Sequence, residues 1–595
     1  MSRNERGVAL ITVLLLAFAL SALALGAGMM AMNTGLIRRY NERFTLVTDA
    51  ALAGLEEGRS RLNGTPSLYP DSGYVVLENG VSVTDASGTT IPGLTRWTWA
   101  GPSGIASGQY GIFGSIISRV TDNTNIQVVR RLEITQTSFA KYAYFSTIEG
   151  TIVFGGGDQI MGPLHSNDDI EVHSSGARFR DIVTTAGTVV NPQYGTFDKG
   201  YTTGVPSIPM PTMTDLTKLM AQAQAGNTYF VGSTAGSDGE ARTRIEFVAV
   251  DLNGDGSLTG EDEGFIKVYQ GNGSNSEDFV TAIRTGGYQP GSNTVRNCGD
   301  FATLLGVTTF MDAASHGAAT LPPHNHAGSA SANRNASLNA ANSKCYLGGD
   351  ATLTNGWVAS NGDGSWVQWG GAVDARLTAL KGAEASYFHP ITRALNPNFK
   401  GVIYVDGKVA ISGMLRGRVT VASPNQIVIA DDMRQTIDPA LGICDDILGI
   451  FSGDDVKMAD NFLLTPLQLP NNSWKNMKAS GNGDDYIHGI ILALDIFGAQ
   501  AYDQGPQSIS QGSCDGTNWG RSCLRLSGGL IQRTRGAVGL ASGYGYLKRY
   551  SYNTCGLTDP PPYFPTTGYF SRNRFYEINP VGFNVATWFA TYQQQ

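Results

Sequence analysis

The strongest hydrophobic pattern in the chain lies at its N-terminus. No residue from Gly7 to Ile37 carries a charge, and the run from Val8 to Met32 is almost entirely apolar. As an α-helix rising about 1.5 Å per residue, this run would extend roughly 37 Å and cross a bilayer core of about 30 Å. The apolar core of a secretory signal is shorter, about 7 to 15 residues. Because the short leader is basic, we expect a membrane-spanning helix with a cytoplasmic N-terminus.

The helical pattern continues beyond the apolar run and becomes amphipathic. Apolar or small residues recur every three or four positions, with charged residues between them. These positions are Tyr40, Phe44, Val47, Ala51, Leu55, Gly58 and Leu62. We therefore predict one helix over residues 8–62, apolar all round in its first half and striped in its second. Such a helix suits a subunit that is stored in a membrane and later packed into a filament.

Short alternating runs follow over residues 63–145, and turn residues separate them. The runs are Tyr74 to Leu77, Val81 to Val83, Arg96 to Trp99, Tyr110 to Arg119 and Ile126 to Ile134. This is the spacing of strands in hairpins. The segment is predicted to form a small antiparallel sheet.

From residue 146 the pattern changes to short β-branched segments separated by glycine. Clear pairs of apolar positions are Ile403 and Val405, Val409 and Ile411, Val419 and Val421, and Ile427 and Ile429. Strands that recur about every eight to ten residues favour a β-solenoid, and a β-sandwich is the alternative. The fold class is therefore α+β and mainly β, with β-rich parts at 146–312 and 345–595. Between them, residues 313–344 are alanine, serine and asparagine with little apolar bulk, which predicts a flexible insert.

Composition agrees with a large β-rich protein made of several domains or of one very extended domain. The chain has 595 residues, of which 15% are charged, 9% are aromatic and 75 are glycine. This is too aromatic for disorder and too rich in glycine for a helical protein. A net charge of −8 argues against nucleic acid as a partner of the whole surface.

Six cysteines lie in the part expected to be exported, where an even count indicates disulfides. They are Cys298, Cys345, Cys444, Cys514, Cys523 and Cys555. Cys514 and Cys523 are the expected local pair. The pairing of the other four stays open.

The N-terminal segment resembles that of type IV pilins, most closely the PilX-like minor pilins. The resemblance is carried by RGVALITVLLLAFALSALAL, followed by RRYNERFTLVTDAALAGLEEGRSRL. It implies a prepilin leader of residues 1–7, cut after Gly7 by a prepilin peptidase, and a methylated N-terminus at Val8. It also implies a bacterial protein held in the inner membrane before assembly, then extracellular in the pilus, with other pilins as partners of the helix.

The chain departs from the pilin pattern at one position. Major pilins have glutamate at the fifth mature position, whereas this chain has Thr12. In the family, that glutamate is thought to neutralise the terminal amine of a neighbouring subunit. A subunit without it resembles the tip pseudopilin of type II secretion, so we expect a place at or near a filament tip. The alternative is a signal-anchored surface protein with a helical stalk.

Several phrases between residues 145 and 570 resemble a domain often fused to PilX-like N-termini, whose function is poorly defined. They are GPLHSN, GVIYVDGKVAISG, LSGGLIQRTRGAVG and PPPYFP. The expected function is a minor pilin that displays this large domain for adhesion and takes part in pilus assembly. A pilin that captures DNA for transformation and a tip pseudopilin are the alternatives, and the partner is then a host or abiotic surface, a glycan or DNA.

One acidic motif has the spacing of a calcium loop. In DLNGDGSLTGEDEG, oxygens at alternating positions precede a glycine turn, and a carboxylate stands at the twelfth place. The candidate ligands of Ca²⁺ are Asp251, Asn253, Asp255, Ser257 and Asp262. The flanking segments have strand character, so we expect a hairpin loop. The alternative is an acidic turn whose residues merely suit the backbone.

Basic residues gather near the C-terminus, interleaved with aromatic ones. They are Arg521, Arg525, Arg533, Arg535, Lys548, Arg549, Arg572 and Arg574. Cations that contact phosphates and rings that stack on bases are typical of a nucleic-acid surface, and such rings also stack on sugars. The alternative is that these arginines cap aromatic faces in a structural terminus.

The sequence contains no convincing catalytic motif. G-x-S-x-G, H-E-x-x-H and the phosphate-binding G-x-x-x-x-G-K-[ST] are absent from it. We therefore expect no enzyme activity.

Overall fold

The computed structural model describes residues 4–70, 72–103, 113–232, 241, 243–271, 287–289, 294–296, 364–458, 466–468, 474–476, 485–499, 502, 523–540 and 545–592. The chain divides into two compact units. The first comprises Met1–Ala106, Ile112–Gln136 and Gly568–Gln595, and the second comprises Ser107–Gly111 and Thr137–Thr567. The predicted flexible insert, 313–344, lies outside the described residues.

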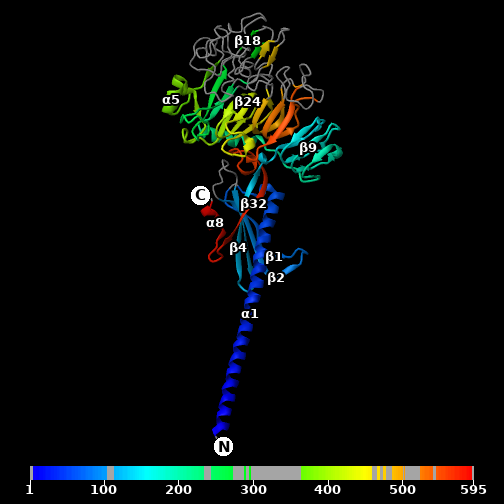
Figure 1. Ribbon diagram of the computed structural model, residues 1–595, viewed down its shortest axis with the longest axis vertical. Coiled ribbons are helices and arrows are strands. Elements are labelled where there is room, and N and C mark those ends of the chain that lie inside the picture. Colours follow the sequence, from blue (N-terminus) through cyan, green and yellow to red (C-terminus); the bar gives the residue numbers. More distant parts are fainter. Residues whose placement is uncertain are drawn as a thin grey trace. The chain divides into compact units, whose positions relative to one another are not determined.

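The first unit combines one long helix with a five-stranded sheet (Figure 1). Its elements are α1 (Asn4–Gly64), β1 (Val75–Thr84), β2 (Thr90–Pro102), β3 (Phe113–Asp122), β4 (Gln127–Ser138), β32 (Thr566–Ile578) and α8 (Val585–Tyr592). The predicted long helix is confirmed, and it runs without interruption from the apolar half into the striped half.

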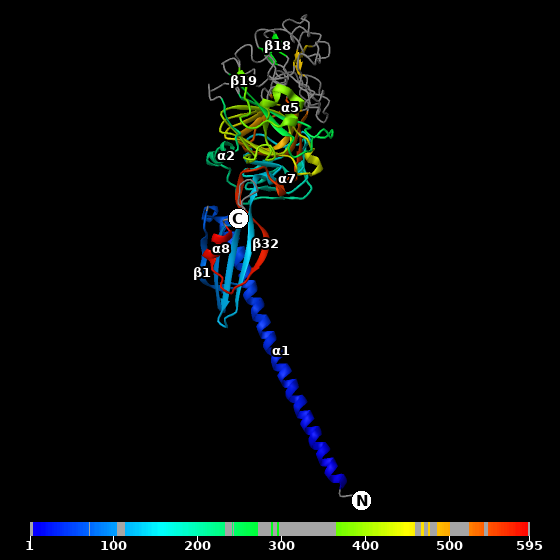
Figure 2. The ribbon, with the colours of Figure 1, turned by 90° about the vertical axis from the view of Figure 1, so that its left-hand side faces the viewer.

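The second half of α1 packs on the sheet through the predicted stripe. Val47, Ala51, Leu55 and Leu62 are fully buried, and they contact apolar residues of the strands. The helix approaches the sheet closely at Gly54, where an added Cβ would lie 2.5 Å from Ser118 Oγ. Figure 2 shows α1 running along the sheet and then extending beyond it as a free rod. Hydrophobic packing therefore fixes only the second half of the helix.

The sheet of this unit is antiparallel where its pairings are described. β1 pairs with β2, β2 with β3, and β3 with β4, as the hairpin spacing predicts. The fifth strand, β32, follows β4 in the strand order, although it comes from the C-terminal end of the chain. The sheet therefore includes a segment that the sequence pattern assigned to the C-terminal β-rich part.

The second unit is mainly β and contains several sheets. Its strands in the first part of the chain are β5 (Tyr144–Ile148), β6 (Asp158–Ile160), β7 (Leu164–Ser166), β8 (Ile170–Glu171), β9 (Ala177–Phe179), β10 (Val183–Thr185), β11 (Val189–Val190), β12 (Gly195–Phe197), β13 (Tyr201–Thr202), β14 (Tyr229–Val231), β15 (Thr243–Ala249), β16 (Gly264–Gly271), β17 (Gly287–Gln289) and β18 (Thr294–Arg296). Those of the later part are β19 (Gly364–Trp366), β20 (His389–Pro390), β21 (Val402–Asp406), β22 (Val409–Leu415), β23 (Arg418–Ser423), β24 (Ile427–Gln435), β25 (Ile447–Ser452), β26 (Val456–Met458), β27 (Pro466–Gln468), β28 (Trp474–Asn476), β29 (Asp485–Ala499), β30 (Cys523–Thr534) and β31 (Leu547–Tyr552). The described helices of this unit are α2 (Met213–Ala225), α5 (Ala375–Lys381) and α7 (Cys555–Thr558).

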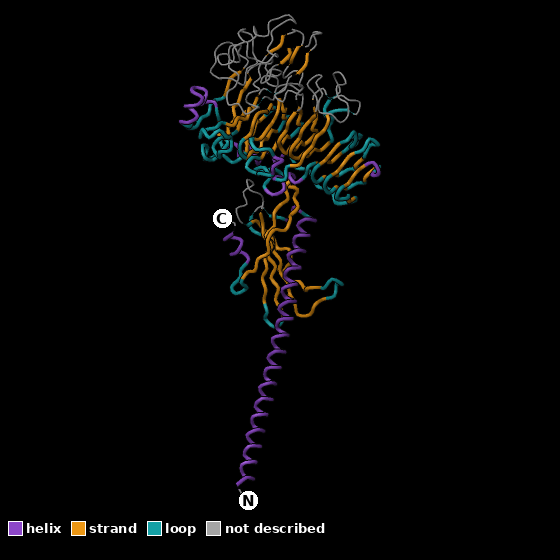
Figure 3. The backbone as a smooth tube through the Cα atoms, viewed as in Figure 1, coloured by secondary structure: helices purple, strands orange, loops and turns teal. Residues whose placement is uncertain are grey.

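Many strands of this unit pair in parallel with a strand two or three further along the chain. Figure 3 shows strands of this unit lying side by side. β21 pairs with β23 and β23 with β25, while β22 pairs with β24 and β24 with β26. In the same way β5 pairs with β7, two strands along, and β7 pairs with β10, three strands along. Equivalent side chains therefore stack, as Ser146 Oγ does on Ser166 Oγ at 3.1 Å, 20 residues further along.

The parallel stack joins the two ends of this unit's sequence. β30 pairs in parallel with β5, so Leu530 lies opposite Tyr144. β31 pairs with β6 in the same way. Strands more than 380 residues apart are thus neighbours, and the chain enters and leaves this stack at one place.

The alternating apolar positions of these strands point into one core. All eight residues named above as pairs in 403–429 belong to its largest cluster and are at most 4% exposed. One disulfide is described in full, Cys444–Cys555. Cys523 is also disulfide-bonded. Its predicted partner Cys514 lies outside the described residues, as do Cys298 and Cys345.

Candidate functional site

The first half of α1 is a fully exposed apolar rod. Every residue from Val8 to Glu42 is exposed, including large side chains such as Phe18 at 76% and Met30 at 74%. In the described part of the chain, α1 is the one helix long and apolar enough to cross a membrane. It is therefore compatible with a membrane anchor or a signal sequence.

The predicted processing site lies within this helix. α1 begins at Asn4, so Gly7 and Val8 already belong to its first turns. Thr12, at the fifth mature position, donates its hydroxyl proton to the Val8 carbonyl oxygen at 2.8 Å. This hydrogen bond satisfies Thr12 within its own helix, whereas a glutamate would place a charge there.

The predicted calcium loop connects two antiparallel strands, β15 and β16, so the expected hairpin is confirmed. The carboxylate of Asp251 accepts hydrogen bonds from the backbone N–H groups of Gly254 (2.7 Å) and Gly256 (2.9 Å). Both glycines have a positive φ, of 73° and 81°, which other residues rarely adopt. The sequence thus folds the loop tightly around the side chain of Asp251.

The next predicted ligands lie in the same turn. Asp255 Oδ1 accepts from the N–H of Ser257 at 2.7 Å, and Asn253 Nδ2 donates to Asp255 Oδ2 at 3.0 Å. The hydrogen bonds from Ser257 lower the pKa of Asp255, which favours its ionised form. Four of the five predicted ligands are therefore close together.

Asp262, the fifth predicted ligand, has another partner. Its carboxylate lies 2.7 Å from Arg376 Nη2, at the start of α5. The neighbouring Glu263 is buried and accepts from the N–H groups of Leu252 (3.2 Å) and Gly260 (2.7 Å). To close a calcium site, Asp262 would have to leave Arg376.

Among the described members of the predicted basic cluster, two form ion pairs inside the second unit. Arg535 is 6% exposed and its Nη1 lies 2.8 Å from Glu149 Oε2. Lys548 pairs with Asp158 at 3.3 Å, and burial lowers the pKa of Lys548. These two cations hold β30 and β31 against the strands that begin the unit, so their role is structural.

The other basic residues of the predicted C-terminal cluster belong partly to the first unit and partly to the second. Arg525 and Arg549 lie opposite one another on β30 and β31. Arg572 and Arg574 are exposed on β32 and belong to the first unit. Arg533 is exposed, and Arg521 lies outside the described residues. Among the members that the structure describes, two thus lie side by side in the second unit and two follow one another on a strand of the first.

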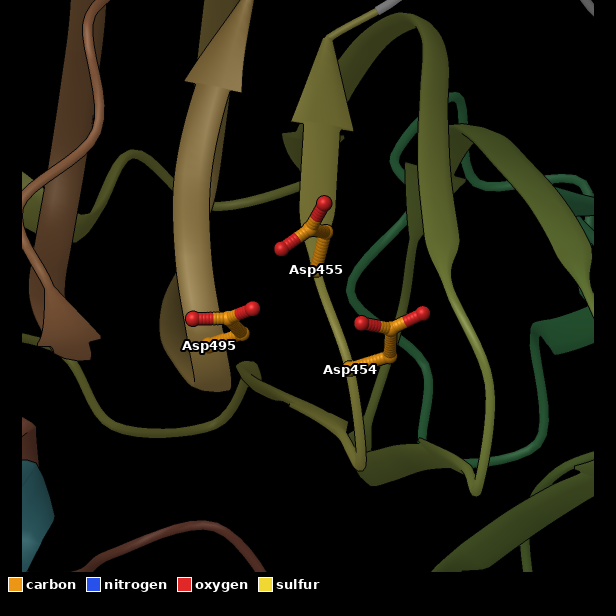
Figure 4. Close-up of side chains that lie close together, drawn as sticks. All are labelled: Asp454, Asp455 and Asp495. Carbon is orange, nitrogen blue, oxygen red and sulfur yellow. The ribbon is translucent and has the colours of Figure 1, made fainter. Parts of the chain in front are cut away.

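An acidic triad that the sequence pattern did not reveal lies in the second unit (Figure 4). Carboxylate oxygens of Asp454, Asp455 and Asp495 lie within 4.8 Å of one another, and among the described residues no other such group meets this distance. Burial and the charge of Asp455 raise the pKa of Asp454. The first two residues precede β26 and the third is on β29, so no local spacing in the sequence announces the triad.

The contacts of Asp455 account for its position without an ion. Its Oδ1 accepts from the N–H of Ile496 at 3.0 Å, and its Oδ2 lies 2.9 Å from Lys457 Nζ. Asp455 therefore ties two neighbouring strands together. We assign no metal to the triad.

Comparisons with family models, with curated proteins and with solved structures gave no match for this chain. Its function is therefore argued from its own residues.

Proposed function

We propose that this chain is a minor pilin-like subunit, held in the inner membrane by the first half of α1 and then packed into a filament through it. One observation carries the proposal: a single 61-residue helix is exposed and apolar in its first half and packed on its own sheet in its second. Large apolar surface in water is unfavourable, at about 25 cal/mol per Å². Lipid and a bundle of like helices would each cover it.

The unbroken helix favours a filament subunit over a simple anchor. A stalk that only tethers a domain needs no continuous backbone between membrane and domain. In this chain the charged residues that follow the apolar half, such as Arg38 and Glu42, pair within the helix at 2.8 Å. The resemblance to PilX-like pilins adds cleavage after Gly7 by a prepilin peptidase and methylation of Val8.

The second unit is proposed to be the part displayed outside the cell for attachment. The regular parallel pairing of its strands supports a β-solenoid, because each turn of chain lies on the preceding one. Disulfide bonds support an oxidising, exported location. Thr12 in place of glutamate supports a position at or near the tip. We also propose that the loop 251–262 binds Ca²⁺, with the spacing of its oxygens as support.

Fractionation of cells that produce the protein tests the filament proposal. We expect the native chain in filaments sheared from the surface, and a Gly7→Leu variant retained in the membrane, because the leader is not removed. Gly26→Ala is the matched control, since an added Cβ at Gly26 meets nothing within 4 Å. The proposal fails if the native chain stays in the membrane fraction, or if both variants behave alike.

A further inference from the structure

The chain returns from the second unit to the first directly after Thr567. Between β31, which ends at Tyr552, and β32, which begins at Thr566, the described chain contains the short helix α7 and no strand. We call residues 555–565 the strap. A load that passes through this exit connection therefore reaches the strap before it reaches any strand that belongs wholly to the second unit.

Side-chain contacts hold the strap against β23. Asp559 of the strap forms an ion pair with Arg418, and the Thr420 hydroxyl donates to the carbonyl oxygen of Pro562. Phe564 is 5% exposed, so the strap is also packed. Each of these contacts is individually weak in water. Because they lie one after another along the strap, a pull from Thr567 would load and break them singly.

The entry side of the second unit is held differently. The chain enters this unit at Thr137 and forms β5 from Tyr144 onward. β5 pairs in parallel with β30 along one edge and with β7 along the other. Two backbone ladders therefore resist a pull on the entry connection. The described exit segment has no ladder of this kind before β31, so it is the weaker connection unless another restraint holds it.

The disulfide supplies a covalent restraint where the strap begins. Cys555 is fully buried in α7 and is bonded to Cys444, which lies between β24 and β25. A pull that has peeled the strap ends at this bond and passes to Cys444. From there it enters strands that are paired in parallel on both sides, β24 with β22 and β26, and β25 with β23 and β29. It bypasses β30 and β31, which lie between the two cysteines in the sequence.

We infer that the Cys444–Cys555 disulfide is a mechanical stop, which passes load from the exit connection directly into the middle of the parallel stack. β30 and β31 then stay folded even after the strap has peeled. The inference rests on the proposed function, because a subunit that attaches from a filament is loaded through the connections between its two units. It adds the means by which the displayed unit stays folded under that load.

The test stretches single molecules of the full chain in detergent with optical tweezers. An azide-bearing amino acid replaces Lys457 of β26 and Val581, whose side chains are accessible, and carries the two handles. With the disulfide intact, the covalent path between the handles is at most about 140 Å long, at ~3.6 Å per residue. Without the disulfide it is about 450 Å long. We expect the native chain to lengthen in a step that releases the strap and then to resist until a higher load.

Cys444→Ser combined with Cys555→Ser removes the stop. At the load that peels the strap of the native chain, this variant should lengthen about twice as far, because β31 and β30 open as well. Arg418→Gln is the matched control, since it removes the ion pair of the strap and keeps the disulfide. Its strap should peel at a lower load, and its lengthening should end where that of the native chain ends.

The inference is overturned if the native chain lengthens beyond about 140 Å, or if its strap and strands open in one step. It is also overturned if the double variant stops where the native chain stops at equal load. The native chain and Arg418→Gln decide the matter if the double variant does not fold. These outcomes leave the filament proposal untouched, because that proposal depends on α1.

Discussion

At the scale of single residues, a buried ion pair stabilises the junction between the first and last strands of the second unit. Arg535 from the segment after β30 pairs with Glu149, and its guanidinium lies 3.8 Å from the ring centroid of Phe154. Both charged side chains are at least 96% buried. Tyr144 also donates its hydroxyl proton to Glu149 Oε1 at 3.1 Å. Removal of one partner would leave a buried charge without compensation.

Glu149→Gln should therefore lower the free energy of unfolding of the second unit by about 3 kcal/mol, the cost of breaking a buried pair on one side. Chemical denaturation of the full chain measures it. Asp198→Asn is the control: Asp198 pairs with Arg178 at 3.1 Å near the surface, where water screens the pair and a much smaller effect is expected. Equal effects of the two substitutions would contradict the structural role given to Arg535.

Substitution of Asp454 should have the opposite effect and stabilise the folded protein. Burial and the charge of Asp455 raise its pKa above the ordinary value of 3.8, so its ionised form destabilises the folded state at neutral pH. Asp454→Asn should raise the melting temperature at pH 7. The gain should disappear at about pH 3, where Asp454 is protonated in both the folded and the unfolded state. A decrease at pH 7 would show that the carboxylate is needed, as a bound cation would require.

At the scale of elements, the hairpin β15–β16 carries the calcium proposal. A weak extracellular site with a Kd of ~10⁻⁴ to 10⁻³ M would be occupied outside the cell. At a calcium concentration about ten times the Kd, binding to the folded loop adds ~1.4 kcal/mol of stability. The native chain should therefore melt at a higher temperature with calcium than with a chelator.

Three variants sharpen this measurement. Asp251→Asn should remove the difference between calcium and chelator, whereas Asp198→Asn should keep it. Arg376→Gln should increase it, because Asp262 is then released from its ion pair and can close the site. The same melting temperature with calcium and with chelator in the native chain would rule the site out.

The elements also show how far the sequence predicts this fold. The helical stripe of Val47, Ala51, Leu55 and Leu62 and the alternating pairs in 403–429 are buried as expected, because local period alone decides which face is apolar. Pairings between distant segments have no local period. The neighbours β30 and β5, and β32 as the fifth strand of the first sheet, therefore could not be predicted.

Sites built from distant segments also leave no local pattern in the sequence, so they could not be predicted from it. The Asp251–Asp262 motif is recognisable because its ligands lie within one loop. The acidic triad and the disulfide of Cys444 with Cys555 are each assembled from distant segments. The basic cluster near the C-terminus was visible as composition, but composition does not show that Arg535 and Lys548 are held by Glu149 and Asp158.

At the scale of the whole molecule, the first half of α1 decides where the protein resides. An apolar rod that is continuous with a packed helix has two suitable environments, a bilayer and a bundle of like helices. Under the filament proposal, the chain moves from the first to the second after its charged leader has been removed. The mature N-terminus therefore reports directly on this passage.

The most direct test is mass spectrometry of the N-terminal peptide of the chain recovered from sheared surface filaments. We expect this peptide to begin at a methylated Val8. A chain that begins at Met1 and is found only in the membrane fraction would contradict it.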